Sequence, residues 1–490
     1  MAYIFFFRMY SGRPENSDVS DEPVFLDKIS SLLQIILYCK IFFKGRRDKI
    51  RSCYFPAFRI FQIIIFKPMY ERMKLSNGMR VVKARNKNIE TVAFLALFFA
   101  GSRDEKGESE GIAHFLEHML FKGTRKRPSS ALINKELDAV GASSNAFTGK
   151  EYTGFWIKCA KKDAGLALDV LSDMILHPLL SDNDIAIERG PVLEEINMYE
   201  DAPMRNISSV LEQLIFDGHS LAHDQLGPAE NVRGFTHKDL LSFYRKHYRP
   251  DNLVLAVSGN FDEKEIDEEV RKCFSDFSGS KGAGKRARFI SRQEKPEISL
   301  KYKKTDQANF SLGFRALPSG HKDEYALDLL NIILGGNDSS RLFETVRERE
   351  GLAYYAYSYS CDYQDTGYIT IQSGVGNANL KKTVALVMEE IRRIRESGVT
   401  EEELERAKSY AEGKMAISLE SSSALADFIA IQEITTGRIL TPKEKFDKIN
   451  AVTGQDIMRI ARGIFASDKL NLAIIGPFKN KGAFEKLLKI

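Results

Sequence analysis

Cysteine is scarce in this chain, and the cysteines present are not spaced as ligands. The five cysteines among 490 residues show neither the paired spacing of a cysteine metal site nor a disulfide framework. Scattered thiols of this kind are typical of a reducing compartment. We therefore expect a cytoplasmic protein without structural disulfides.

An excess of one charge is also missing from most of the chain. The whole sequence holds 71 Lys+Arg against 67 Asp+Glu, and its first 68 residues hold 11 against 6. The chain from Met69 onward therefore carries 60 against 61, a balance of −1. Nucleic-acid binding depends on a basic surface, so we expect no nucleic-acid partner.

Apolar runs long enough to span a membrane are absent. The longest candidates, residues 32–43 and 61–66, both lie near the N-terminus, and each is shorter than the roughly 20 apolar residues of a spanning helix. We interpret residues 1–68 as an atypical N-terminal extension, poorly ordered or non-native, with the natural chain starting at Met69 or Met73. A membrane-associating leader is the alternative that we do not favour.

The few histidines are concentrated in one stretch, residues 111–124. Only 8 occur in the chain, yet His114 and His118 stand four apart with Glu117 beside them. In a helix, positions four apart share one face, so both imidazoles can bind one cation while apolar residues form the other face. This arrangement suits zinc, which in catalytic sites takes three protein ligands and a water. We predict Zn²⁺ as the cofactor and Glu117 as the general base that activates zinc-bound water.

A second candidate helix, residues 185–199, carries two carboxylates on one face. Glu188 and Glu195 are seven positions apart, which is two helical turns. Acidic residues on a helix usually form a solvated face, so the spacing alone leaves their role open. Pro191 within this helix predicts a kink near Ile187.

The two segments together resemble the pitrilysin/insulinase family of inverted-motif zinc peptidases, especially its bacterial members and the mitochondrial processing peptidases. The resemblance rests on HFLEHMLFKGT at 114–124, followed 77 residues after His118 by Glu195 within ERGPVLEEINMYED. It implies that His114, His118 and Glu195 bind the metal, that Glu117 is the general base and that Glu188 is a supporting acidic residue. It covers about the last 422 residues.

The family also implies an internal duplication, of which the sequence shows a weak trace. Thr153-Gly-Phe-Trp-Ile157 recurs as Thr366-Gly-Tyr-Ile-Thr370, an offset of 213. Each copy is followed by a long helix pattern and then by an acidic helix start. Where the metal helix would recur, residues 331–336 contain neither His nor Glu. We predict that only the first half holds zinc.

We expect an α+β fold of two tandem homologous domains, each a mostly antiparallel sheet covered by helices, forming a clam-like chamber. Residues 278–285 have the Gly/Ser/Lys composition of a flexible linker. The predicted domains are a catalytic zinc-binding domain at 69–277, a linker at 278–297, and a non-catalytic domain at 298–490 that contributes substrate contacts.

The resemblance further implies substrate-binding residues in both halves. Arg347 and Tyr354 match an Arg and a Tyr, seven residues apart, that reach towards substrate and zinc; the arginine would anchor the peptide and the phenol would donate to the oxyanion. Arg341 competes for the arginine role. Asn145 and Ala146 lie in a strand that resembles the edge strand with which an extended substrate pairs, although Asn145 fits a turn residue equally well.

The function that we predict is a zinc-dependent metalloendopeptidase that hydrolyses peptides, unfolded polypeptides or presequence-like segments. The alternative is a non-catalytic scaffold or partner subunit of a processing-peptidase-like complex, since the family also contains such halves. The sequence leaves open whether two chains associate as a homodimer.

Overall fold

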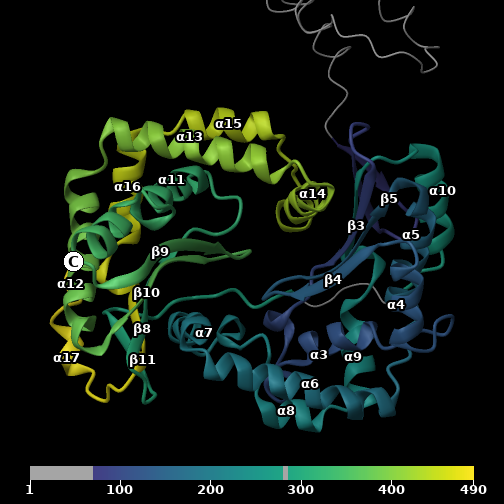
Figure 1. The fold of residues 1–490 in the computed structure, drawn as a ribbon, viewed down its shortest axis with the longest axis horizontal. Helices are drawn as coiled ribbons and strands as arrows, with labels where there is room; N and C mark the ends of the chain where they lie inside the picture. The colour runs from purple at the N-terminus through teal and green to yellow at the C-terminus, as the bar shows by residue number, and fades with distance from the viewer. Residues whose placement is uncertain (1–69, 280–284) are drawn as a thin grey trace, which may run out of the picture. The chain divides into compact units, whose positions relative to one another are not determined.

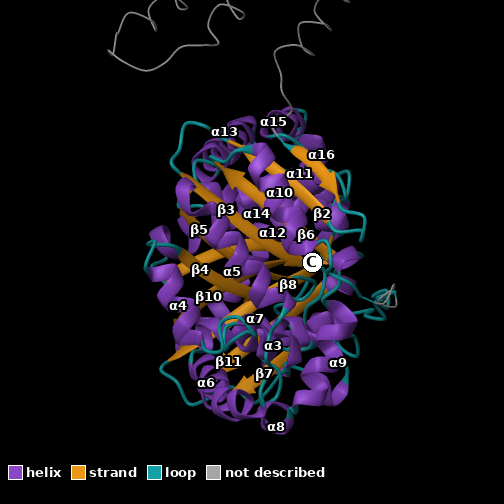
Figure 2. Cartoon of the chain, turned by 90° about the vertical axis from the view of Figure 1, so that its right-hand side faces the viewer, coloured by secondary structure: helices purple, strands orange, loops and turns teal. Residues whose placement is uncertain are grey.

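The computed structural model describes residues 70–279 and 285–490. The extension at residues 1–68 and both of its interpretations lie outside this part of the chain. Within the described residues, no helix is both long enough and apolar enough to cross a membrane. Figure 2 shows the helices in purple and the strands in orange.

The first sheet has six strands and is antiparallel except where β2 pairs with β6. In spatial order they are β1 (Glu71–Lys74), β2 (Arg80–Arg85), β6 (Leu253–Gly259), β3 (Thr91–Phe98), β5 (Thr153–Ala160) and β4 (Ser143–Thr148). The helices between these strands are α3 (Ile112–Leu120), α4 (Ser130–Asp138), α5 (Ala164–Leu176), α6 (Asp182–Asp201), α7 (Pro203–Ile215), α8 (Ala229–Gly234) and α9 (His237–His247), and α10 (Glu263–Phe274) follows β6.

The second sheet has five strands, and only β7 and β11 run parallel. Its order is β7 (Glu297–Tyr302), β11 (Leu470–Gly476), β8 (Gln307–Ala316), β10 (Gly367–Gly376) and β9 (Ala353–Asp362). Its helices are α11 (Glu324–Gly335), a π-helical segment (Phe343–Arg349), α12 (Leu380–Ser397), α13 (Glu401–Ser418), α14 (Ser422–Thr436), α15 (Pro442–Asn450), α16 (Gly454–Ile464) and α17 (Gly482–Glu485).

The two sheets are copies of one plan. Strands β2-β6-β3-β5-β4 and β7-β11-β8-β10-β9 have the same spatial order and the same parallel pair. Helix α11 follows β8 as α3 follows β3, and its residues 324–335 contain no histidine. The prediction of an α+β fold with two homologous halves is confirmed.

One helix of each half packs on the sheet of the other half. Helix α7 comes from the first half but packs on β8 and β11, whereas α14 comes from the second half and packs on β3 and β6 (Figure 1). Gly313 of β8 permits this contact, because a Cβ there would lie 2.8 Å from a methyl group of Leu211 on α7. The sequence predicted sheets covered by helices, but not this exchange.

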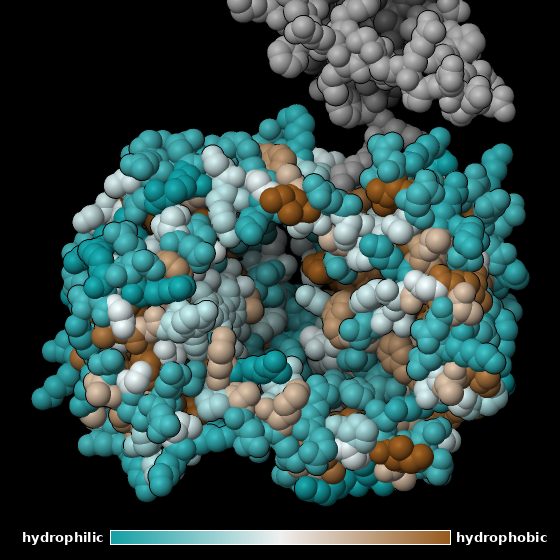
Figure 3. All heavy atoms as spheres, in the orientation of Figure 1, coloured by the Kyte–Doolittle hydropathy of each residue, from teal (hydrophilic) through white to brown (hydrophobic). Residues whose placement is uncertain are grey.

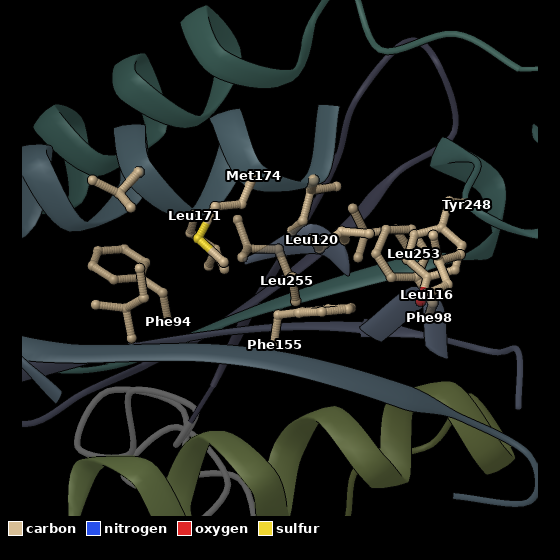
Figure 4. Close-up of a cluster of buried hydrophobic side chains, with 14 of the residues drawn as sticks. Phe94, Phe98, Leu116, Leu120, Phe155, Leu171, Met174, Tyr248, Leu253 and Leu255 are labelled. Atoms are coloured by element: carbon tan, nitrogen blue, oxygen red, sulfur yellow. The ribbon is translucent and has the colours of Figure 1, made fainter. Parts of the chain in front are cut away.

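The core of the first half holds the metal helix from behind. Leu116 and Leu120 of α3 belong to the buried cluster of the first half, in which Leu116 lies by Phe98 and Leu120 lies by Leu255 and Phe155 of the sheet (Figure 4). Burying a side chain of this size is worth about 1.5–3 kcal/mol. The apolar back of α3 is therefore fixed on the sheet, and this sets where its polar residues lie.

The predicted boundaries of the helix at 185–199 agree with the structure to within a few residues. The expected helix at 185–199 is part of α6, which runs from Asp182 to Asp201 and continues through Pro191. His177 is the C-cap residue of α5. Residues 285–296 carry no helix or strand. The proposed domain boundaries at 277 and 298 remain predictions.

Candidate metal centre

Helix α3 begins at a tightly fixed first turn. Gly111, its N-cap, has a φ of +93°, and a Cβ there would lie 2.5 Å from the carbonyl oxygen of Leu226. The buried carboxylate of Glu105 accepts hydrogen bonds from the N–H groups of Gly111 (2.9 Å) and Ala113 (2.8 Å). These two bonds satisfy backbone donors that have no partner within the helix, immediately before His114.

Three side chains from two helices meet at one point. Nε2 of His114 lies 3.2 Å from Nε2 of His118. Oε2 of Glu195, on α6, lies 3.4 Å from the first nitrogen and 3.6 Å from the second. Within the described residues, these three form the one group of His, Cys, Asp or Glu whose ligand atoms could hold a metal ion.

These separations fit zinc. Tetrahedral ligands bound at the usual zinc distances to nitrogen and oxygen are separated from one another by about 3.4 Å. The three measured edges of 3.2, 3.4 and 3.6 Å agree with this value. Two imidazoles and one carboxylate are a donor set of catalytic zinc sites, which keep one position for substrate or water.

A second carboxylate of α6 orients one ligand. Oε1 of Glu188 lies 2.8 Å from Nδ1 of His118, and its other oxygen pairs with the ammonium group of Lys122. With the proton on Nδ1, His118 donates to Glu188 and presents an unprotonated Nε2 to the metal. The structure thus brings Glu188, the predicted supporting residue, against a predicted ligand.

Burial and neighbouring charges shift the pKa values of the two ligand histidines in opposite directions. The pKa of His114 is lowered to about 4, chiefly by burial and also by the neighbouring His118. Burial opposes the charged form of His118 too, but its contacts with Glu188 and Glu195 outweigh burial and raise its pKa to about 9. Zinc binding must therefore displace a proton, because a histidine ligand is neutral.

Glu117 lies beside the ligands on α3 and does not belong to the group of three. Its Oε2 accepts a hydrogen bond of 2.6 Å from the hydroxyl of Thr148, the last residue of β4. Burial raises the pKa of Glu117, and the bond from Thr148 opposes that shift. A carboxylate with a raised pKa is suited to exchange protons near neutral pH.

Strand β4 forms one edge of the first sheet. Asn145 is exposed on it, and its side-chain oxygen accepts the N–H of Ala146 at 2.9 Å. Asn145 therefore lies in a strand rather than in a turn.

Arg347 and Tyr354 form a pair with each other in the second half. The guanidinium group of Arg347 lies 5.2 Å from the ring centroid of Tyr354, which is 84% exposed. In the described chain, neither residue forms a hydrogen bond or an ion pair with the three ligands or with Glu117. Arg341, the competing arginine, is held by the carboxylate of Glu403 at 2.7 and 2.8 Å.

Two residues of the site were missed by the sequence analysis. They are Thr148, which donates to Glu117, and Glu105, which accepts from the first turn of α3. For Glu105, the available signal was a carboxylate in the polar segment ahead of a helix start, a signal that Glu108 and Glu110 share. Thr148 gave no such signal, because its contact depends on how β4 packs against α3.

Comparison with known proteins agrees with this geometry. The family model described as "Insulinase (Peptidase family M16)" matches residues 80–229, and the one described as "Peptidase M16 inactive domain" matches residues 234–410. The second description fits a half in which α11 lacks histidine.

Curated relatives match over nearly their whole length. The chain is 37% identical over 412 residues to the uncharacterized zinc protease YmxG of Bacillus subtilis, which covers 84% of this chain and 99% of that protein. An uncharacterized zinc protease of Streptomyces coelicolor is 34% identical over 84% of this chain and 90% of its own length. A protease structure from Helicobacter pylori shares the fold with a TM-score of 0.79 and 24% identity, covering 84% of this chain and all of that one.

The duplicated fold and the His-His-Glu group define a two-half zinc peptidase. The chain belongs to the insulinase family, peptidase family M16, and it is a zinc protease.

Proposed function

We propose that the chain is an endopeptidase that cleaves extended peptides, including presequence-like segments, with Glu117 as the general base. The main support is the carboxylate of Glu117, which lies next to the His-His-Glu group and is held by Thr148. Its position fits the role of a group that moves protons without binding the metal.

The ligands His114, His118 and Glu195 would hold zinc, which supplies a Lewis acid that polarises the scissile carbonyl and acidifies water. Glu117 takes the proton of the attacking water and then delivers it to the leaving amine. Glu188 keeps the ring of His118 in its binding orientation through their 2.8 Å contact.

The free edge of β4 is proposed to bind the substrate backbone. An edge strand offers unpaired N–H and C=O groups, and an extended peptide can add to it as a further strand. Asn145 and Ala146 lie on this strand, which ends at the hydroxyl that contacts Glu117. Strand addition would therefore align a peptide with the base and would demand little of its sequence.

Arg347 and Tyr354 are proposed to contact the substrate from the second half. Tyr354 is largely exposed, so its phenol is free to donate to the developing oxyanion. The guanidinium group of Arg347 would bind a carbonyl or carboxylate group of the peptide. A clam-like chamber between the halves would then select unfolded or short chains.

The test combines zinc content with cleavage of a peptide library. Each peptide is blocked at both ends, so that cleavage demonstrates endopeptidase action, and the products are identified by mass spectrometry. Glu117→Gln is expected to retain zinc and to lose about 10²–10⁴-fold in turnover, whereas His118→Ala should lose zinc.

Unchanged turnover in Glu117→Gln would rule out this mechanism. Cleavage only of peptides with a free end would rule out the endopeptidase. A presequence-like basic amphipathic peptide and a scrambled peptide of the same composition provide the matched pair for substrate preference.

A further inference from the structure

We propose that Thr148 is a positioning residue that holds the carboxylate of Glu117 for proton transfer and ties it to the strand on which an extended peptide pairs. The inference rests on the proposed function, because it assigns Glu117 the role of base. Thr148 itself contacts neither the ligand atoms nor the reacting atoms. It acts through Glu117.

The contact between the two side chains is short and directional. The hydroxyl Oγ1 of Thr148 donates to Oε2 of Glu117 at 2.6 Å, and both residues are half-buried. A hydrogen bond to a carboxylate is about twice as strong as one between neutral groups. It occupies one oxygen of Glu117 and leaves the other for the proton.

The side chain of Thr148 can adopt few orientations. Threonine is branched at Cβ, so its hydroxyl has few rotamers within a strand. Glu117, by contrast, has three side-chain torsions and would sample several orientations without an anchor. The bond from Thr148 therefore removes freedom from the base more than from its partner.

The strand that carries Thr148 is seated against the metal helix. Successive strand residues point to opposite sides, so Ser144, Ala146 and Thr148 lie on the same face of β4. Ala146 packs against the hydrophobic core of the first half, and β4 lies against α3. A peptide pairing with the outer edge of β4 would steady the same strand whose last residue holds Glu117.

The chain beyond Thr148 is anchored on its far side. The carbonyl of Gly149 accepts the N–H of Ser102 at 3.2 Å. The N–H of Gly149 donates to the carbonyl of Tyr152 at 2.8 Å. The ammonium group of Lys150 pairs with Glu212 of α7 at 3.0 Å. These contacts fix the backbone next to Thr148, and a positioning residue requires such a fixed backbone.

A purely structural role for Thr148 is the competing explanation, and the hairpin supplies a control for it. Thr153 is the residue paired with Thr148 in the register of β4 and β5. Its buried hydroxyl donates to the carbonyl of Ala100 at 2.8 Å, away from Glu117. Thr153→Val removes a hydroxyl from the same hairpin without touching the base.

The experiment compares Thr148→Val, Thr148→Ser and Thr153→Val in the full zinc-loaded chain, using a blocked peptide that the wild type cleaves. Thr148→Val should lower kcat by about ten- to a hundredfold, because a hydrogen bond to a charged group is lost. KM should stay within about twofold and zinc content should stay unchanged. Thr148→Ser should recover kcat to within about threefold of the wild type.

Two further measurements separate positioning from folding and from binding. Thr153→Val should lower the melting temperature while its kcat stays within about twofold of the wild type. In the inactive Glu117→Gln background, adding Thr148→Val should leave the Kd for the peptide unchanged, as measured by fluorescence anisotropy.

The inference is overturned if Thr148→Val keeps its kcat, if Thr148→Ser is as impaired as Thr148→Val, or if the loss falls on KM or zinc content. These outcomes are distinct from failure of the proposed function. A wild type that cleaves no blocked peptide, or a Glu117→Gln variant that still does, refutes the proposed function itself.

Discussion

Oε2 of Glu151 accepts a hydrogen bond of 2.9 Å from the backbone N–H of Gln364, and these two residues hold corresponding places in the two halves. The recurrence of Thr153-Gly154 as Thr366-Gly367 has an offset of 213, which also relates 151 to 364. The turns of the two equivalent hairpins, β4–β5 and β9–β10, therefore meet directly.

A buried arginine forms ion pairs with both of these turns. Nη1 of Arg103 lies 2.6 Å from Glu151 and 2.7 Å from Asp365, and the arginine side chain is 1% exposed. Without Arg103, Asp365 loses this ion pair and Glu151 keeps only Arg286, at 3.6 Å, and breaking a buried ion pair is costly. Arg103→Met is therefore expected to lower the free energy of unfolding by about 3–5 kcal/mol, measured by denaturant titration.

An exposed ion pair is the control for this prediction. Lys443 and Asp447 lie 2.8 Å apart with side chains 78% and 65% exposed. Lys443→Ala should cost less than about 1 kcal/mol. If Arg103→Met were no more damaging than Lys443→Ala, the contact between the hairpins would not be what fastens them.

Glu188 is expected to set zinc affinity rather than the chemical step. Its 2.8 Å contact orients the ring of His118, and removing such a partner typically costs 10–100-fold in metal affinity. Glu188→Ala should therefore release zinc to a competing chelator at about 10–100-fold lower chelator activity. Glu194→Ala, an exposed glutamate of the same helix, should leave zinc affinity unchanged, and equal effects of the two variants would contradict the assignment.

Glu105 is expected to support the start of α3. Its two oxygens accept from Gly111 and Ala113, so Glu105→Ala leaves both donors buried and should cost at least about 1–3 kcal/mol in stability. Glu105→Gln keeps only one acceptor oxygen and should fall between the wild type and the alanine variant. Thermal unfolding of these variants, with the exposed Glu108→Ala as the control, measures the order, and a Gln variant as stable as the wild type would refute it.

The local part of the site could be predicted from sequence, and the remote part could not. His114 and His118 are four apart, so helical periodicity alone places them together. Glu195 is 77 residues further on, and only the family resemblance connected it with them. The bond from Thr148 to Glu117 depends on the packing of β4 against α3, for which the sequence has no spacing rule.

The exchange of helices illustrates the same limit. An amphipathic pattern in α7 shows that the helix has an apolar face, but not which sheet that face covers. In the structure α7 covers the sheet of the other half. The kink that Pro191 predicts near Ile187 stays a prediction; α6 continues through Pro191 and brings both Glu188 and Glu195 to the site.

His247 is expected to make the fold sensitive to acid. It is 3% exposed, it packs on Phe243 at a ring distance of 4.4 Å, and neither of its ring nitrogens has a hydrogen-bond partner in the described chain. Burial lowers its pKa to about 4, and three nearby cations, Lys246, Arg249 and Arg286, act in the same direction while Asp104 opposes them. The folded chain therefore binds this proton less readily than the unfolded chain does.

Since the unfolded-state pKa is about 6.5, the contribution of His247 to stability is fully present above that pH. It is lost progressively as the pH falls from about 6.5 to about 4, by up to about 3 kcal/mol.

His247→Leu keeps an apolar side chain of similar size against Phe243 and removes the titrating group. The stability of the wild type relative to this variant should therefore fall across this window, as measured by urea titration between pH 8 and pH 4 with chelator present. His177→Leu, at a position whose side chain is 53% exposed, controls for loss of a surface histidine. A wild type whose advantage over His247→Leu stayed constant from pH 8 to pH 4 would show that His247 is not the acid-sensitive group.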